Sequence, residues 1–184
     1  PLPLHARFIS KSAIMLTTSR LLIRALSAQD ADDLYRIYGD PQTNAFNPAG
    51  PYPSLEYARE RLAQWIKEYE HYGYGNWAIA LKASPQQTLG FAGITVRMLD
   101  GMLTHNLGYR FSPQAWGQGI ASEFCNFALR YAFTTLGLHD VTAVVRPMHT
   151  ASQRVLEKSG MSEVATVSDV PNAPPSRVYR LTAQ

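Results

Sequence analysis

The chain has 184 residues, of which 46% are hydrophobic and 17% are charged, and this composition is typical of one compact globular domain rather than a disordered chain. Its aliphatic stretches are far shorter than the roughly 20 residues that cross a bilayer, so we expect no membrane partner. The single cysteine, Cys125, excludes an intramolecular disulfide and a thiolate cluster. Because no two of the five histidines are four residues apart, we expect no metal site.

The charge is modest: 17 Lys and Arg against 14 Asp and Glu give a formal net charge of +3. The basic residues are scattered, so we expect an anionic small ligand rather than direct nucleic-acid binding, which would require a basic stripe. Charged and proline residues interrupt the first 16 residues, which is unlike a secretory signal. We therefore expect a cytoplasmic protein, a monomer or homodimer, with residues 1–16 as an N-terminal extension and residues 17–184 as a single domain.

The first half of the chain predicts a strand, two helices and an antiparallel meander. Residues 21–26 favour a strand, and Ser27 is a suitable cap for a helix that reaches Tyr38. After a loop over residues 39–53, the apolar residues of 55–69 form one helical stripe. Three strands are then expected at residues 77–81, 89–96 and 103–111, the first two joined by a turn containing Pro85.

After Phe111 the hydrophobic period becomes helical, and Gly137 ends this helix. Cys125 lies in its apolar stripe without a polar activator, which predicts a packed thiol rather than a nucleophile. A strand at 141–145, a helix at 150–159 and a hairpin of strands at 163–167 and 177–181 complete the chain. We therefore predict an α/β (α+β) fold with about four helices and a mixed, mostly antiparallel sheet of six to seven strands.

Residues 109–123 read as a strand, a glycine-rich loop and a helix start. About four backbone N–H groups at a helix start lack intrahelical partners, and the positive end of the helix dipole lies there, so a phosphate is a natural ligand. Gly117, Gly119 and the small Ala121 leave the backbone accessible, and Ser122 adds a hydroxyl donor. The alternative is a glycine turn that only begins a helix.

Two other phosphate-loop motifs fit this segment poorly. A Walker A loop requires a Gly-Lys-Ser/Thr sequence, but no lysine lies between Gly101 and Leu156. A dinucleotide fingerprint requires a third glycine where Ser122 stands, and an acidic residue at the end of the next strand. Asp140 instead precedes that strand, so both motifs are excluded.

From Leu21 to Leu181 the chain resembles the GCN5-related N-acetyltransferases (GNAT), in particular the branch of ribosomal-protein N-terminal acetyltransferases. Residues 116–121, Trp-Gly-Gln-Gly-Ile-Ala, match the family's loop pattern, with tryptophan in place of its Arg or Gln, as is common in this branch. Residues 145–161 are similar to the family's Asn-x-x-Ser/Ala…Glu-Lys-x-Gly-Phe helix, and residues 18–24 and 39–41 also resemble this branch.

The resemblance implies an acetyl-CoA-dependent N-acetyltransferase, without a metal, in which a primary amine attacks the thioester directly. Acetyl-CoA would lie between splayed central parallel strands, with the pantetheine on main chain near Tyr109 and Phe111 and the pyrophosphate on residues 117–122. The residues that the resemblance assigns to acetyl-CoA binding are Tyr109, Phe111, Trp116, Gly117, Gln118, Gly119, Ile120, Ala121, Ser122, His149 and Ser152.

Three polar groups that are usual in the family are replaced here. Its helix asparagine is His149, its tyrosine general acid is Leu156, and the glutamate of this branch is Asn106. We retain Ser152 and Asn106 as candidate catalytic residues, although Ser152 is also suited to capping its helix. His105 neighbours Asn106, but strand alternation predicts that it lies on the opposite face.

An enzyme without an evident base suits an amine of low pKa. Deprotonating a lysine at pH 7 costs roughly 4.6 kcal/mol, whereas an α-amine costs about 1 kcal/mol. We therefore expect a peptide N-terminus or a small amine as acceptor, in a cleft formed by residues 39–53 and 169–176. A non-catalytic acyl-CoA-binding or regulatory module remains the first alternative, and a nucleic-acid-binding domain, with an affinity that falls steeply with salt, is the second. Four aromatic residues line this cleft or pack in the core: Tyr52, Tyr72, Tyr74 and Trp77.

Overall fold

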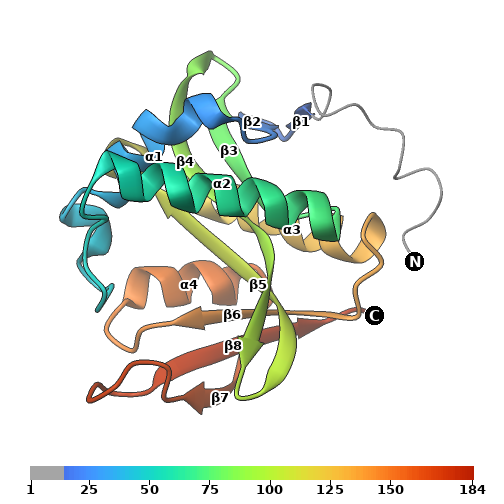
Figure 1. The fold of residues 1–184 in the computed structure, drawn as a ribbon. Coiled ribbons are helices and arrows are strands. Elements are labelled where there is room, and N and C mark those ends of the chain that lie inside the picture. Colours follow the sequence, from blue (N-terminus) through green and yellow to red (C-terminus); the bar gives the residue numbers. More distant parts are fainter. Residues whose placement is uncertain (1–14) are drawn as a thin grey trace.

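The structure is a computed structural model that describes residues 15–184. It contains one eight-stranded sheet in the order β1-β2-β3-β4-β5-β6-β8-β7, in which only β5 and β6 are parallel (Figure 1). The mixed α/β class is confirmed, with one strand more than the predicted six to seven. The strands are β1 Met15–Thr17, β2 Leu21–Arg24, β3 Asn76–Leu81, β4 Ser84–Leu99, β5 Met102–Phe111, β6 Asp140–Val145, β7 Ser162–Val167 and β8 Ser176–Thr182.

Strand β1 contains Met15 and Leu16, which the sequence analysis assigned to the N-terminal extension. Met15 pairs with Arg24 and Leu16 with Ile23, so these two residues belong to the sheet. The other residues of the proposed extension, 1–14, lie outside the described part of the chain. The β1 pairing therefore places Met15 and Leu16 with the folded domain and not with the extension.

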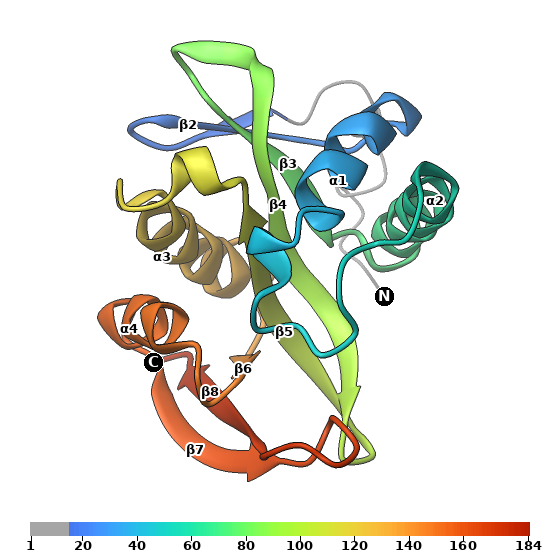
Figure 2. The ribbon, with the colours of Figure 1, turned by 90° about the vertical axis from the view of Figure 1, so that its left-hand side faces the viewer.

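Within residues 15–184, four α-helices cover the two faces of the sheet, which is the number predicted. In Figure 2, α1 (Ala31–Tyr38) and α2 (Leu55–Tyr72) lie on one side of β4 and β5, whereas α3 (Ile120–Thr134) and α4 (Thr150–Lys158) lie on the other. None of the helices in residues 15–184 has the length and apolar character needed to cross a bilayer. Short 3-10 turns stand at Ala28–Asp30, Gln42–Asn44 and Pro113–Ala115.

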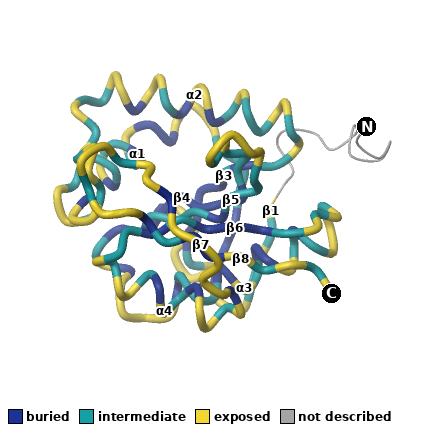
Figure 3. Tube along the Cα trace, turned by 90° about the horizontal axis from the view of Figure 1, so that it is seen from below, coloured by how far each residue is buried: buried dark blue, intermediate teal, exposed yellow. Residues whose placement is uncertain are grey.

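The core is divided by the sheet into two clusters, and the inner strands are the most buried part of the molecule (Figure 3). On the α3 side, Trp77 and Phe124 are fully buried, and Cys125 packs beside them with no exposed surface. Burial raises the pKa of the Cys125 thiol to about 12. The prediction of a packed thiol is therefore confirmed.

The position of Pro85 corrects the prediction for the β3–β4 connection. The turn consists of residues 82 and 83, and Pro85 lies within β4. Leu81 of β3 pairs with Ser84 of β4, but the preceding residue, Ala80, pairs with Thr88. Residues 85–87 therefore form a bulge without partners on β3. A bulge accepts proline because the absent N–H would have no ladder partner there.

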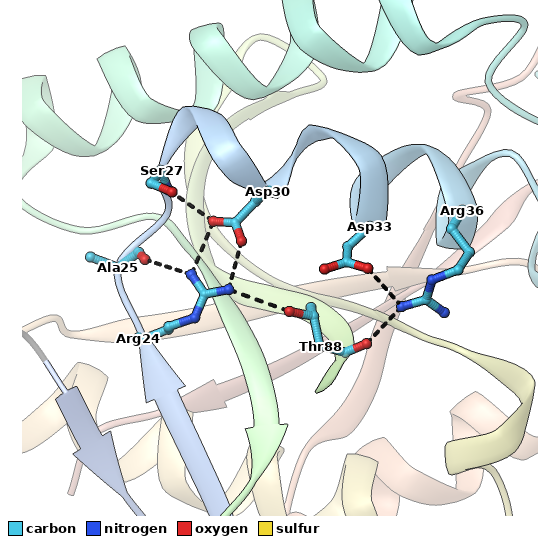
Figure 4. Close-up of polar contacts among 7 residues, drawn as sticks. All are labelled: Arg24, Ala25, Ser27, Asp30, Asp33, Arg36 and Thr88. Carbon is cyan, nitrogen blue, oxygen red and sulfur yellow. Dashed lines mark hydrogen bonds and ion pairs between the residues drawn. The ribbon is translucent and has the colours of Figure 1, made fainter. Parts of the chain in front are cut away.

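Helix α1 is fixed to the sheet by a buried ion pair, and the 3-10 turn before it explains why α1 begins later than Ser27. Asp30 is 4% exposed, and its carboxylate lies 2.6 Å from the Arg24 guanidinium. The Ser27 backbone N–H donates to the same carboxylate at 2.8 Å. Arg36 of α1 also donates to the carbonyl of Thr88 in β4 (Figure 4). The loop that follows α1 therefore starts from a fixed position.

Strands β5 and β6 separate after a single point of contact. Their only bridge joins Asn106 to Thr142, although β5 continues to Phe111 and β6 to Val145. Beyond the bridge, β5 remains paired with β4, and β6 remains paired with β8. The two central strands thus splay apart, as the resemblance implied, and the segment that begins α3 follows directly from the end of β5.

Candidate active site

The loop between β5 and α3 has the backbone geometry of an anion-binding helix start. Gly117 and Gly119 have φ angles of 73° and 76°, which are left-handed values that favour glycine. Gly119 is the N-cap, and the first helical hydrogen bond is donated by Glu123 to the Gly119 carbonyl. The N–H groups of Ile120, Ala121 and Ser122 therefore lack helical acceptors and are available to a ligand.

The side chains of this loop contribute less than its backbone. Ile120 is 2% exposed and packs in the core, so it can offer a ligand only its main chain. The side-chain amide of Gln118 donates to the Gln114 carbonyl. Trp116 is 51% exposed, and its indole N–H donates to the Phe111 carbonyl at 3.0 Å. That bond occupies the carbonyl oxygen of a residue that the resemblance assigned to pantetheine.

An arginine that sequence reasoning did not single out lies against this loop. Arg20, in the turn between β1 and β2, donates to the Gln118 carbonyl at 2.8 Å and to the Glu123 carboxylate at 2.7 Å. The Thr18 hydroxyl donates to the same carboxylate at 2.6 Å. A Cβ atom on Gly119 would lie 3.5 Å from the Arg20 guanidinium. The sequence feature that could have pointed to Arg20 is the segment 18–24, which resembles the family and contains both Thr18 and Arg20.

On the α3 side of the opening, Tyr109 of β5 meets Ser152 of α4. Their hydroxyl oxygens are 2.8 Å apart. Burial raises the pKa of Tyr109, so the phenol retains its proton across the neutral range. Ser152 does not cap its helix, because the N-cap position is His149 and no side chain caps there. The pair therefore places two hydroxyl groups together beside the splayed strands.

Asn106 lies on the other face of β5, since Leu107, Tyr109 and Phe111 all face the α3 cluster and strand side chains alternate. Its side-chain oxygen is buried and has no hydrogen-bond partner among the described residues. His105 faces away from Asn106, as predicted, and its Nδ1 lies 2.9 Å from the Tyr74 hydroxyl. An unpartnered buried oxygen is costly unless a ligand or water donates to it.

The loop between α1 and α2 spans the opening on this second face. The Arg110 guanidinium donates to the Asn44 side-chain oxygen at 2.8 Å. Phe46 stacks on His149 with ring centroids 4.4 Å apart and an interplanar angle of 14°. The loop therefore contacts both β5 and the residue before α4, and Figure 2 shows it in cyan in front of β5. Burial lowers the pKa of His149, and the charge of Arg110 lowers it further.

The four aromatic residues assigned either to the cleft or to packing all make packing contacts. Trp77 is fully buried in the core, where its indole donates to the Tyr69 hydroxyl, so it does not line a cleft. Tyr52 packs against Tyr38 with ring centroids 5.2 Å apart, beside the α1–α2 loop. Tyr72 and Tyr74 lie next to each other, with ring centroids 6.2 Å apart, and Tyr74 also contacts His105.

The 169–176 loop is fixed by ion pairs. Asp169 pairs with Arg97 of β4 at 3.2 Å and with Arg146 at 3.8 Å, and it accepts a hydrogen bond from Ser176. This loop is therefore bound to the β4–β5 hairpin. Within residues 15–184, no group of three His, Cys, Asp or Glu side chains is arranged to hold a metal ion.

Comparison with known proteins identifies the family. Residues 20–162 match the Acetyltransferase (GNAT) domain. An uncharacterized N-acetyltransferase, p20, from Bacillus licheniformis is 27% identical over 159 residues, which cover 86% of this chain and 88% of that protein. The family match extends over the loop before α3 and all of α4.

Two solved structures share the fold. A putative ribosomal-protein-serine acetyltransferase from Vibrio cholerae superposes with a TM-score of 0.76 at 17% identity, covering 95% of this chain and all of that chain. A spermidine N-acetyltransferase from Vibrio cholerae, in complex with CoA and spermine, gives a TM-score of 0.73 at 17% identity, covering 90% and 96%. The family match favours an enzyme over a non-catalytic module. The chain therefore belongs to the GNAT family, and it is an acetyltransferase.

Proposed function

We propose that the protein transfers the acetyl group of acetyl-CoA to a primary amine, and that its acceptor is an α-amine at a peptide N-terminus or on a small molecule. The observation that carries this proposal is the separation of β5 from β6 beside the left-handed glycine loop. The gap offers unpaired backbone to a pantetheine arm, and the loop offers free N–H groups to a pyrophosphate. A GNAT neighbour with bound CoA supports this choice of donor.

Backbone groups supply most of the proposed donor site. The free N–H groups of residues 120–122 would hold the pyrophosphate, with Ser122 as an additional hydroxyl donor. Arg20, whose guanidinium is paired with Glu123, holds the Gln118 carbonyl at the same place. Because backbone donors and the helix dipole provide this attraction, a protein with a net charge of only +3 is sufficient for a polyanionic ligand.

In the proposed reaction the amine lone pair attacks the thioester carbonyl carbon. The tetrahedral intermediate then collapses as the carbon–sulfur bond breaks, and the former amine loses a proton to water. The CoA thiolate leaves with the bonding electron pair and gains a proton. We assign the donation of this proton to Ser152, whose hydroxyl is hydrogen-bonded to the protonated Tyr109. Asn106, with its unpartnered oxygen, would accept a hydrogen bond from the attacking amine.

Thermal shift with acetyl-CoA tests the donor site. Gly119→Glu places a side chain and a negative charge in the loop, so we expect the stabilisation by acetyl-CoA to disappear. Gly137→Glu is the matched control at the far end of α3, because Gly137 has a φ angle of 67° and a Cβ atom there would have no neighbour within 4 Å. It imposes the same backbone strain without altering the loop. An unchanged acetyl-CoA shift in Gly119→Glu would refute the phosphate assignment.

The rates of CoA release with two peptides test whether the acceptor is an α-amine. The energetic gap of roughly 3.5 kcal/mol between deprotonating a lysine and an α-amine at pH 7 predicts a strong preference for the α-amine. We expect CoA release with an unblocked peptide that lacks lysine, and little release with an N-terminally blocked peptide that contains one lysine. Comparable rates on the two peptides would contradict the α-amine proposal while leaving the acetyltransferase assignment intact.

A further inference from the structure

Arg110 is a fixed cation without a carboxylate partner on the second face of β5. It makes one side-chain hydrogen bond, to Asn44, and no ion pair with any residue in the range 15–184. Asn44 is 5% exposed, and its amide nitrogen donates to the Tyr38 and Asp40 carbonyls, so its oxygen is held in place. The guanidinium is thus positioned by a buried group, not by a counter-ion.

Aromatic packing orients the same guanidinium. Its central carbon lies 4.4 Å from the centre of the Tyr38 ring, which fixes one face of the group and leaves its edge for hydrogen bonds. A second cation, Arg61 of α2, lies close by: burial raises the pKa of Tyr52, and both Arg61 and Arg110 oppose that rise. The surroundings of Tyr52 are therefore positively charged, which adds to the attraction of Arg110 for an anion.

The carboxylates of the surrounding segments are engaged elsewhere. Asp40 accepts from the Gln42 backbone N–H at 2.8 Å. Asp169 is bound to Arg97 and Arg146. No described carboxylate thus neutralises Arg110, and its charge is available to a ligand that enters from this face.

We propose that the acceptor carries an anionic group, a carboxylate or a phosphate, near its reacting amine, and that Arg110 binds this group. The inference rests on the proposed function, because it assigns the substrate class of the same site. Asn106 and Arg110 share one face of β5, and four residues of strand separate their Cα atoms by about 13 Å. Side chains on one face of a strand stand roughly parallel, so the two polar groups keep about this separation. An amine hydrogen-bonded to Asn106 and an anion paired with Arg110 would each lie about 3 Å from its partner, which leaves roughly 7 Å, the span of one or two peptide residues.

This placement selects against polycationic acceptors. An anion would form a charge-assisted, bidentate pair with the guanidinium. A polyamine would instead bring positive charges toward Arg110 and Arg61, and like charges in a partly desolvated site repel strongly. The acceptor specificity therefore differs from that named for the spermidine N-acetyltransferase that shares this fold.

Matched acceptors test the proposal through CoA release. We compare dipeptides with the same first residue followed by Asp, phosphoserine, Asn or Lys, and include spermidine. We expect kcat/KM for the Asp or phosphoserine peptide to exceed that for the Asn peptide by about tenfold or more, mainly through KM, as for one charged hydrogen bond. The peptide with the larger gain identifies carboxylate or phosphate as the preferred anion, and spermidine should be the poorest acceptor.

Two variants separate the role of Arg110 from a general effect of charge. Arg110→Gln should reduce the preference for the anionic peptide to less than about threefold, by the same reasoning, while the thermal shift with acetyl-CoA persists. Arg59→Gln is the control, because Arg59 lies on the exposed surface of α2, paired with Glu56. Equal kcat/KM for the Asp and Asn peptides in the unaltered protein, or a preference that survives in Arg110→Gln, would overturn the proposal.

Failure of the proposed function has a different signature. If none of the acceptors releases CoA, the N-acetyltransferase proposal for these amines fails. The affinity of the CoA-loaded protein for the Asp and Asn dipeptides, measured by calorimetry, then tests the anion site directly. Tighter binding of the Asp peptide that is lost in Arg110→Gln supports the site, and equal affinities overturn it.

Discussion

The two faces of β5 are built by different kinds of interaction. Toward α3, Leu107 and Phe111 pack in an apolar core, and the loop that follows is shaped by left-handed glycines. On the other face, Arg110 is held by Asn44, which lies 66 residues away in the sequence. The proposed donor side therefore depends on backbone conformation within one short segment. The proposed acceptor side depends on polar side chains brought together from distant segments, so it is more sensitive to changes elsewhere.

The largest expected effect comes from a substitution beside α1, and it tests whether the proposed acceptor side is sensitive to changes in distant segments. Asp30→Asn leaves the partly buried Arg24 without its charge partner, so we expect the free energy of unfolding to fall by about 3 kcal/mol. Because α1 leads into the loop that carries Asn44, acceptor KM should rise more than acetyl-CoA affinity falls. Urea unfolding and acceptor kinetics measure the two effects.

Asp33→Asn provides the control for the preceding variant. Its ion pair with Arg36 is 3.2 Å long and exposed on both sides, so its loss should cost less than about 1 kcal/mol. If the two substitutions lowered the free energy of unfolding equally, then burial would not determine how much the Arg24–Asp30 pair stabilises the fold.

The second effect tests the pair of hydroxyls between α4 and β5. Ser152→Ala should lower kcat by about 100-fold, as for loss of a general acid, with the acetyl-CoA thermal shift retained. If Tyr109 acts through Ser152, then the double variant with Tyr109→Phe should be no slower than Ser152→Ala alone. Ser159→Ala is the control at the end of the same helix, where the hydroxyl donates to the Val155 carbonyl. Additive losses would mean that the two hydroxyls act separately.

The sequence predicted the strand, loop and helix of the proposed donor side well because their signals are contiguous. Strand, glycine loop and apolar helix follow one another between residues 103 and 136, and each signal is local. The sequence analysis explained Gly117 and Gly119 by access to the backbone, and the structure adds a second reason, since both have positive φ angles. The same local reasoning misplaced the β3–β4 turn at Pro85, because a proline in a bulge and a proline in a turn look alike in sequence.

The proposed acceptor side was largely hidden from the sequence. The stacking of Phe46 on His149 and the bond between Arg110 and Asn44 join residues about 100 and 66 positions apart, and neither pair belongs to a periodic pattern. The contact of Arg20 with Glu123 was hidden for the same reason. Such pairs arise from tertiary packing, which single-sequence propensity does not encode.

The third effect tests whether a side chain also contributes to the proposed donor side. Arg20→Gln removes a cation that donates to the Gln118 carbonyl, so we expect acetyl-CoA to bind about tenfold more weakly. Arg180→Gln is the control, because its ion pair with Asp140 lies on β8 and β6, away from the loop. Calorimetry measures both affinities, and an unchanged affinity in Arg20→Gln would show that backbone alone forms the phosphate site.

The same contact predicts a dependence of stability on pH. Burial favours a higher pKa for Glu123, but hydrogen bonds from Thr18 and from the backbone and side chain of Arg20 outweigh it, so the pKa lies below its ordinary value. A depressed carboxyl pKa stabilises the fold above the unfolded value and loses that contribution as pH falls through the folded one. Glu123→Gln should therefore be less stable than the unaltered protein at pH 7, and the difference, measured by urea unfolding, should shrink below about pH 4.

The smallest effect returns to the proposed acceptor side, at His149. Because burial and Arg110 lower its pKa, the folded state binds fewer protons than the unfolded chain, and stability should decrease slightly as pH falls from 7 toward 5. His149→Phe retains an aromatic ring for stacking on Phe46 but cannot titrate, so this part of the pH dependence should vanish. His71→Phe, on the exposed end of α2, is the control. If the dependence persists in His149→Phe, then a group other than the His149 imidazole causes it, and the stacking on Phe46 does not couple to pH.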